Sequence, residues 1–289
     1  MLESRRLHAF NDLWALDTDS WEWARCEAAP DAPAPCARDR AAMAAVAGGA
    51  ALLVYGGADA ANRRLDDCWL YDLKKRRWSE VRPPGPRPRG CCSATLFSLG
   101  DRMALYGGDV AGPSAALWSL RGAAALLEGG GAGSAGGGGG GDASSARAAP
   151  CGWTLLELGG DVAAARRGHA AAPLGATVAV VGGLTETRAG VLGIKRQLEL
   201  RADVAVLERR AGGLGWRAAA PAPGAVPAAR EKATLTALAD GRALLFGGEF
   251  SCFLELPDEA ENVIATNQST NQPTNQPTNQ PLIADHYPK

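Results

Sequence analysis

The sequence predicts an all-β fold assembled from copies of one stranded unit. Four short apolar runs each end in a pair of glycines. Apolar, β-branched and aromatic residues in such runs are typical of half-buried strands. A unit repeated roughly every 50 residues cannot bury its apolar face alone and has to stack on its own copies. The paired glycines are Gly56 and Gly57, Gly107 and Gly108, Gly182 and Gly183, and Gly247 and Gly248.

Further positions recur around each glycine pair. An arginine precedes the pair and opens another apolar strand, as Arg38 does before Gly56. After the pair comes a strand with aromatic residues, 67–72 in the first unit, and then a tryptophan, which is large enough to fill the gap between neighbouring sheets. The N-terminus repeats only this second half. The recurring residues are the arginines Arg38, Arg89, Arg167 and Arg230 and the tryptophans Trp23, Trp78, Trp153 and Trp216.

Arginine, glycine pair, aromatic strand and tryptophan, in this order, resemble the kelch repeat. That resemblance implies a four-stranded blade of a β-propeller. It covers residues 7–256 and implies about four to five recognisable blades. The expected divisions are a partial blade at 7–27, blades at 38–82, 89–158 and 167–219, and a partial blade at 230–256.

Three segments depart from the repeat. A glycine-rich insert at 129–149 is expected to be a flexible linker. Extra residues at 184–202 lengthen the third unit, and its following strand at 203–207 lacks the usual aromatic residues. The tail at 259–289 repeats Thr-Asn-Gln-Pro/Ser and has almost no apolar residues, so we expect it to be disordered.

The ends of the repeat array leave two interpretations open. The chain starts with the outer strands of a blade and reaches only the inner strands of another after the last glycine pair. These halves could join and close a ring of four blades. Alternatively, the chain is an incomplete part of a larger ring, which we favour because kelch rings usually have more blades. An open ring would expose strand edges.

Composition narrows the class of protein. The net charge of −1 and the pI near 6.3 argue against nucleic acid as a partner. No apolar run approaches the roughly 18 residues of a membrane span, and no signal region follows the N-terminus. The seven cysteines show no Cys-x-x-Cys pair, which fits reduced thiols. We therefore expect a cytoplasmic protein without membrane or nucleic-acid partners.

Catalytic signatures are missing from the sequence. None of the three histidines has a second histidine or a cysteine at metal-ligand spacing, and no nucleophile elbow or phosphate loop occurs. We expect no catalytic residues, no cofactor and no metal. The leading interpretation is a non-catalytic protein-interaction module, a scaffold or adaptor. The alternatives are a propeller domain of an oxidase- or isomerase-type enzyme, and a truncated, non-functional fragment.

One surface feature suggests a ligand. If the first strand of each blade is innermost, as in kelch-like propellers, the recurring arginines gather at one mouth of the channel. Guanidinium groups grip carboxylates bidentately, so this mouth is predicted to bind acidic peptide segments. The alternative is that these arginines bond to carbonyls and acids and hold the blades together. The predicted binding residues are Arg38, Arg40, Arg89, Arg167, His169, Arg230 and Lys232.

Overall fold

The computed structural model describes residues 9–27, 32–128, 151–160, 163–189, 195–220, 224 and 226–250. The chain divides into two compact units, Met1–Phe253 and Leu254–Lys289, and every described residue belongs to the first. The predicted insert at 129–149 and the predicted tail at 259–289 lie outside the described residues.

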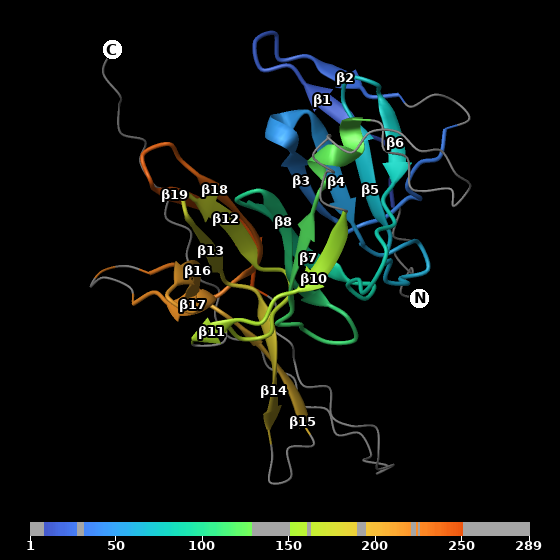
Figure 1. Cartoon of the computed structure of the whole chain (residues 1–289). Helices are drawn as coiled ribbons and strands as arrows, with labels where there is room; N and C mark the ends of the chain where they lie inside the picture. Colours follow the sequence, from blue (N-terminus) through green and yellow to red (C-terminus); the bar gives the residue numbers. More distant parts are fainter. Residues whose placement is uncertain are drawn as a thin grey trace, which may run out of the picture. The chain divides into compact units, whose positions relative to one another are not determined.

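Three sheets have the strand order of propeller blades, as the sequence predicted (Figure 1). In each, four consecutive antiparallel partners follow one another from the innermost strand outward. The first blade contains β3 (Ala42–Val46), β4 (Ala51–Tyr55), β5 (Cys68–Asp72) and β6 (Arg77–Glu80). The second contains β7 (Cys92–Leu99), β8 (Arg102–Asp109), β9 (Leu117–Arg121) and β10 (Gly152–Leu155). The third contains β12 (Ala170–Leu174), β13 (Thr177–Val181), β16 (Val204–Arg210) and β17 (Gly213–Ala218).

The remaining elements are short. The strand β11 (Gly159–Gly160) adds a parallel edge to the third blade, and 3-10 turns occupy Ala47–Gly49 and Ala124–Glu128. The extra residues of the third unit form an antiparallel hairpin of β14 (Leu184–Ala189) and β15 (Lys195–Leu200), which projects away from the blades in Figure 1. The strand without aromatic residues still takes the third place in its blade, as β16.

Two hairpins each contain half of a blade. The N-terminal hairpin consists of β1 (Trp14–Leu16) and β2 (Trp23–Arg25), and it corresponds to outer strands. The C-terminal hairpin consists of β18 (Glu231–Ala237) and β19 (Ala243–Glu249), and it corresponds to inner strands. Each hairpin is a separate two-stranded sheet among the described residues.

The core lies between the blades. The inner strands contact one another in the order β3, β7, β12, β18. An aromatic residue before the glycine pair packs on the outer-strand tryptophan of the next blade. The ring centroids of Tyr55 and Trp153 are 5.4 Å apart, and those of Tyr106 and Trp216 are 4.8 Å apart. Both tyrosines are buried.

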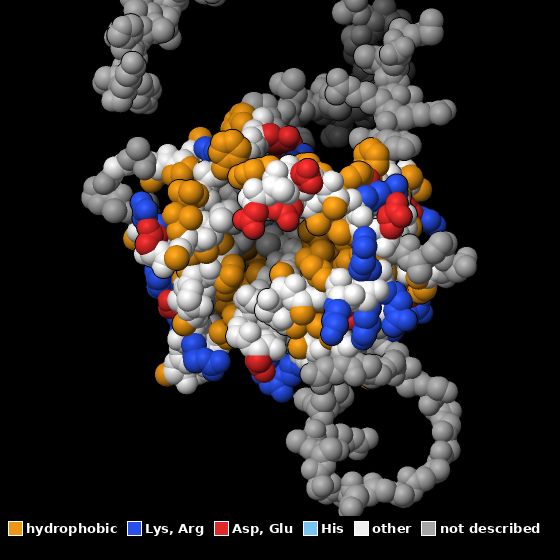
Figure 2. All heavy atoms as spheres, turned by 90° about the horizontal axis from the view of Figure 1, so that it is seen from above, with side chains coloured by type: hydrophobic (Ala, Val, Ile, Leu, Met, Phe, Trp, Pro, Cys, Tyr) orange, Lys and Arg blue, Asp and Glu red, His pale blue; other side chains and the backbone are white. Residues whose placement is uncertain are grey.

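The short turns between paired strands of the blades lie at one end of these strands, and Figure 2 shows the molecule from that end. Hydrophobic side chains line a hollow near the middle of this face, and lysine and arginine side chains gather at the right of the view. The basic turn between β5 and β6 contains Lys75, which pairs with Asp72 and donates to the backbone carbonyl of Leu127. The loops that follow the glycine pairs lie at the opposite ends of these strands and form the candidate site.

Candidate functional site

Arg38 links separate segments of its own blade through its guanidinium group. Its guanidinium donates to both carboxylate oxygens of Asp67, at 2.7 and 2.8 Å, and to the backbone carbonyls of Gly56 and Cys36. The side chain is only 6% exposed. Asp67 also accepts from the indole nitrogen of Trp69, at 2.7 Å. We call this bonded set of arginine, aspartate and first glycine the blade clamp. It ties the start of the inner strand to the start of the third strand.

The blade clamp of the third blade uses Arg166, one residue before the predicted position. Arg166 is fully buried, donates to the carbonyls of Ala164 and Gly182, and pairs with Asp203 at 2.8 Å. The interblade hydrogen bonds establish this equivalence. The second glycine of each pair donates to the carbonyl of the clamp position in the next blade, Cys91, Arg166 or Arg230.

The second blade has no clamp. Its clamp position holds Cys91 in place of arginine, and the position corresponding to Asp67 and Asp203 holds Ala116. Both halves of the ion pair are therefore replaced together. Arg89, the arginine that the repeat spacing selected, is exposed, and its side chain forms no hydrogen bond or ion pair with the described residues.

A second set of equivalent residues lines the inner side of the loops. Arg40, Ser93, Gly168 and Lys232 all have positive φ, between 52° and 62°. Their backbones form a chain of hydrogen bonds from blade to blade, in which each residue donates to the carbonyl of the one before, at 2.7–2.9 Å. This backbone geometry sets the direction in which the side chains at these positions leave the chain. Of the predicted binding residues, this set includes Arg40 and Lys232.

Arg167 faces a carboxylate that the sequence did not single out. Asp109 accepts from Arg64 at 3.0 Å, from Arg167, and from the backbone N–H groups of Ala111 and Gly112. Burial raises the pKa of Asp109, but these hydrogen bonds outweigh it and lower the pKa to about 2. The sequence contains one signal for Asp109. This residue directly follows a glycine pair, whereas the first unit has Ala58 at that position.

This cluster borders a cavity of about 300 Å³, lined by Arg64, Asp109, Arg167 and Leu198, among others. Arg64 comes from the first blade, Arg167 from the start of the third, and Leu198 from β15. The side chains of Arg64 and Arg167 are 36% and 28% exposed, whereas Asp109 is 4% exposed. The cavity therefore presents guanidinium edges to solvent.

His169 is packed inside the interface between the second and third blades. It is 6% exposed, and its ring lies edge-on to Tyr106 at 5.0 Å. Neither ring nitrogen has a hydrogen-bond partner among the described residues. Burial, reinforced by Arg166, lowers the pKa of His169 to about 3, so the ring is neutral at pH 7. Both ring nitrogens are buried, so His169 does not present them to a ligand in solution, contrary to the binding role predicted for it.

Comparisons with known proteins identify the repeat. Residues 3–108 match the model of the KLHDC2/KLHL20/DRC7 Kelch-repeats domain. This segment contains kelch repeats. The chain is 29% identical over 112 residues to human Kelch domain-containing protein 3, covering 37% of this chain and 27% of that protein.

Two further relatives match a similar length of this chain. One is Tip elongation aberrant protein 1 of Schizosaccharomyces pombe, 29% identical over 34% of this chain and 8% of that protein. The other is the Dynein alpha chain, flagellar outer arm, of Chlamydomonas reinhardtii, 39% identical over 35% of this chain and 2% of that protein. The matched segment is a small part of each of these proteins.

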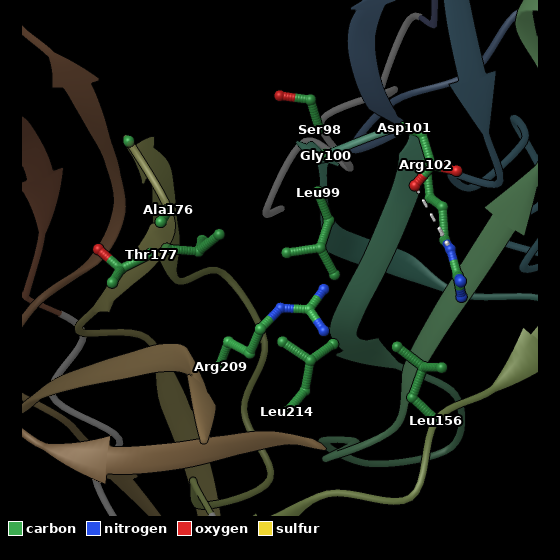
Figure 3. A pocket seen from close by; sticks show the side chains of 12 residues that line it. Ser98, Leu99, Gly100, Asp101, Arg102, Leu156, Ala176, Thr177, Arg209 and Leu214 are labelled. Atoms are coloured by element: carbon green, nitrogen blue, oxygen red, sulfur yellow. Dashed lines mark ion pairs between the residues drawn. The ribbon is translucent and has the colours of Figure 1, made fainter. Parts of the chain in front are cut away.

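A larger cavity of about 450 Å³ lies at the other end of the kelch blades, between the second and third (Figure 3). The β7–β8 turn and the β12–β13 turn form its rim. Figure 3 shows Arg209 reaching toward Leu99 and Leu214, while Asp101 pairs with Arg102 at 3.6 Å. This ion pair is open to solvent on the carboxylate side, because Asp101 is 86% exposed.

The described residues contain no group of three His, Cys, Asp or Glu side chains arranged to hold a metal ion. Within the same residues, no helix has the length and apolar character needed to cross a bilayer.

Proposed function

We propose that this chain is a non-catalytic protein-interaction module that presents its loops on a rigid kelch scaffold. The observation that carries the proposal is the backbone chain of hydrogen bonds through Arg40, Ser93, Gly168 and Lys232. It holds loops from successive blades in one geometry, and such preorganisation lowers the entropy lost when a partner binds. The kelch relatives support this class of function.

The preferred ligand is an acidic peptide segment, bound by a smaller set of residues than the sequence suggested. The clamp arginines Arg38 and Arg166 already pair with carboxylates inside their blades. Arg40 and Lys232 instead form exposed ion pairs, with Asp39 and Glu249. Exposed pairs contribute little, about 0–1 kcal/mol, so an incoming carboxylate can replace them. Arg64, at the edge of the cavity, offers a third cation.

The test is a titration of the full chain with a fluorescent oligoglutamate peptide, with oligoglutamine as the neutral control. We expect saturable binding of oligoglutamate that weakens as salt rises. Arg40→Glu with Lys232→Glu should reduce the affinity at least tenfold. Lys74→Glu, in the exposed turn at the opposite end of the strands, is the matched control and should change it little.

Equal binding of both peptides, or equal loss in the Lys74→Glu control, would contradict the acidic-peptide proposal. The broader proposal is tested separately, by affinity capture with the wild-type chain and identification of a partner. Failure to capture any protein with a fully folded chain would argue against an interaction module.

A further inference from the structure

We propose that β18–β19 of one copy is completed by β1–β2 of a second copy, so that the two hairpins form one four-stranded blade between chains. This interface differs from the loop face described above, although Lys232 and Glu249 of that face belong to the same β18–β19 hairpin. The proposal rests on the blade clamp, on the exposed apolar residues of both hairpins, and on where each hairpin is held.

Arg230 is half of a blade clamp. Its guanidinium donates to the carbonyls of Ala228 and Gly247, which correspond to the bonds that Arg38 makes to Cys36 and Gly56. Arg230 forms no ion pair with the described residues, so none of them supplies the carboxylate of this clamp. The inner half of the clamp is therefore assembled without its aspartate.

Asp12 is the other half. It precedes β1 as Asp67 precedes β5, and it accepts from the indole nitrogen of Trp14 at 2.7 Å, just as Asp67 accepts from Trp69. Asp12 is exposed and has no cationic partner in the part of the chain that the structure describes. The outer half of a clamp is thus built without its arginine.

The complete blades show that clamp arginine and clamp aspartate occur together. Both are present in the first and third blades, and both are replaced in the second, by Cys91 and Ala116. We therefore expect Arg230 to pair with an aspartate and Asp12 to pair with an arginine. Together these residues satisfy each other's missing charge.

The apolar residues agree with this pairing, because the equivalent tyrosines are buried by the next blade. The first blade of the second copy, which lies beside its own β1–β2, would become the next blade for β18–β19. Phe246 on β19 corresponds to Tyr55 and Tyr106, yet it is 80% exposed, whereas the tyrosines are 1% and 0% exposed. In the first blade Tyr55 pairs with Cys68 across β4 and β5. The same register places Phe246 opposite Leu13, directly before β1.

Within one copy the hairpins are held by different blades. The N–H of Arg38, before β3, donates to the carbonyl of Phe10, which places β1–β2 beside the first blade. The N–H groups of Gly183 and Lys232 connect β18–β19 with the third blade. The hairpins therefore lie at the two ends of the row of inner strands. A second copy can supply the missing half without either copy refolding.

The test exchanges the charges of the clamp in the 289-residue chain and measures mass by light scattering over a range of concentrations. Wild type should form a dimer. Asp12→Arg and Arg230→Asp should each weaken self-association at least tenfold, because two like charges then meet. A mixture of these two variants should form a dimer again. One of its interfaces joins the two substituted side chains, whose charges are again opposite, and the other joins the two unchanged residues.

Three outcomes would overturn the proposal. One is a monomeric wild type at every concentration. Another is a mixture that stays monomeric while the double variant recovers a compact monomer, which is the result expected if one chain joins its own hairpins. The third is Asp12→Arg dimerising as wild type does. Arg230→Lys keeps the charge and is the folding control for the residue that also bonds to the backbone, and each variant's melting temperature is compared with wild type.

Discussion

The residue before the glycine pair has opposite environments at two ends of the molecule. Tyr106, in the second blade, is fully buried against Trp216 and donates to the carbonyl of Ala164 at 3.2 Å. Phe246 occupies the same repeat position in β19 and is 80% exposed. The local strand is similar in both places. The difference shows that a kelch blade does not bury its own aromatic residue, and that the next blade buries it.

The largest expected effect comes from truncating these two aromatic residues. Tyr106→Ala should lower the free energy of unfolding by about 3–5 kcal/mol, because it empties a closely packed interface. Phe246→Ala should change it by less than about 0.5 kcal/mol at low protein concentration, as for other exposed residues. Chemical denaturation measures both. An equal loss would contradict the comparison, and a loss for Phe246→Ala that appears only at high concentration would support pairing between copies.

The clamps provide the next contrast. Arg166→Met should cost about 3 kcal/mol, because it leaves Asp203 and the carbonyl of Gly182 without their buried partner. Arg230→Met, at the half-built clamp, should cost about 1 kcal/mol, the range of ordinary hydrogen bonds. Thermal and denaturant unfolding of the two variants side by side tests this order. If Arg230→Met is as damaging as Arg166→Met in the monomer, the clamp interpretation is wrong.

The glycines allow a matched comparison of close approach. Gly182 and Gly247 have nearly the same φ, 67° and 69°, so alanine carries a similar backbone strain at both. A Cβ at Gly182 would lie 2.5 Å from the carbonyl oxygen of Arg230, whereas a Cβ at Gly247 meets nothing within 4 Å. Gly182→Ala should therefore be about 2 kcal/mol more destabilising than Gly247→Ala. Equal losses would mean that the blades separate easily at this point.

A pH dependence due to His169 is also expected. Its folded pKa, about 3, lies below the ordinary value of about 6.5, so the unfolded chain takes up a proton first and acid destabilises the fold. Between about pH 6.5 and 4.5, wild type should lose stability with a slope approaching 1.4 kcal/mol per pH unit. In the other inner strands, the position equivalent to His169 holds alanine, namely Ala41, Ala94 and Ala233.

His169→Ala should remove this slope, although it lowers stability at pH 7 through lost packing. Asp109 does not interfere, because its carboxyl group, with a pKa of about 2, contributes stability that is lost only below about pH 4. An unchanged slope in His169→Ala would show that the ring is already protonated, or that it reaches water.

The sequence by itself predicted where the strands lie, because apolar runs and glycine pairs act locally, and its resemblance to the kelch repeat predicted the four-stranded blade. Trp153 and Trp216 are in the core as expected. Trp23, at the same repeat position as Trp153, is 65% exposed, since no neighbouring blade covers it in the described part of the chain. Burial at these positions depends on the neighbour, which a single unit's pattern does not contain.

The tertiary structure alone decided which arginines form clamps and which border the cavity beside Asp109. Arg166 and Arg167 are adjacent, so their spacing to the glycine pair is almost equal, yet one is buried on Asp203 and the other faces Asp109. Successive residues in an extended strand point to opposite sides, so a shift of one residue exchanges these roles. The hydrogen bonds between blades set that register, and they join residues far apart in the sequence.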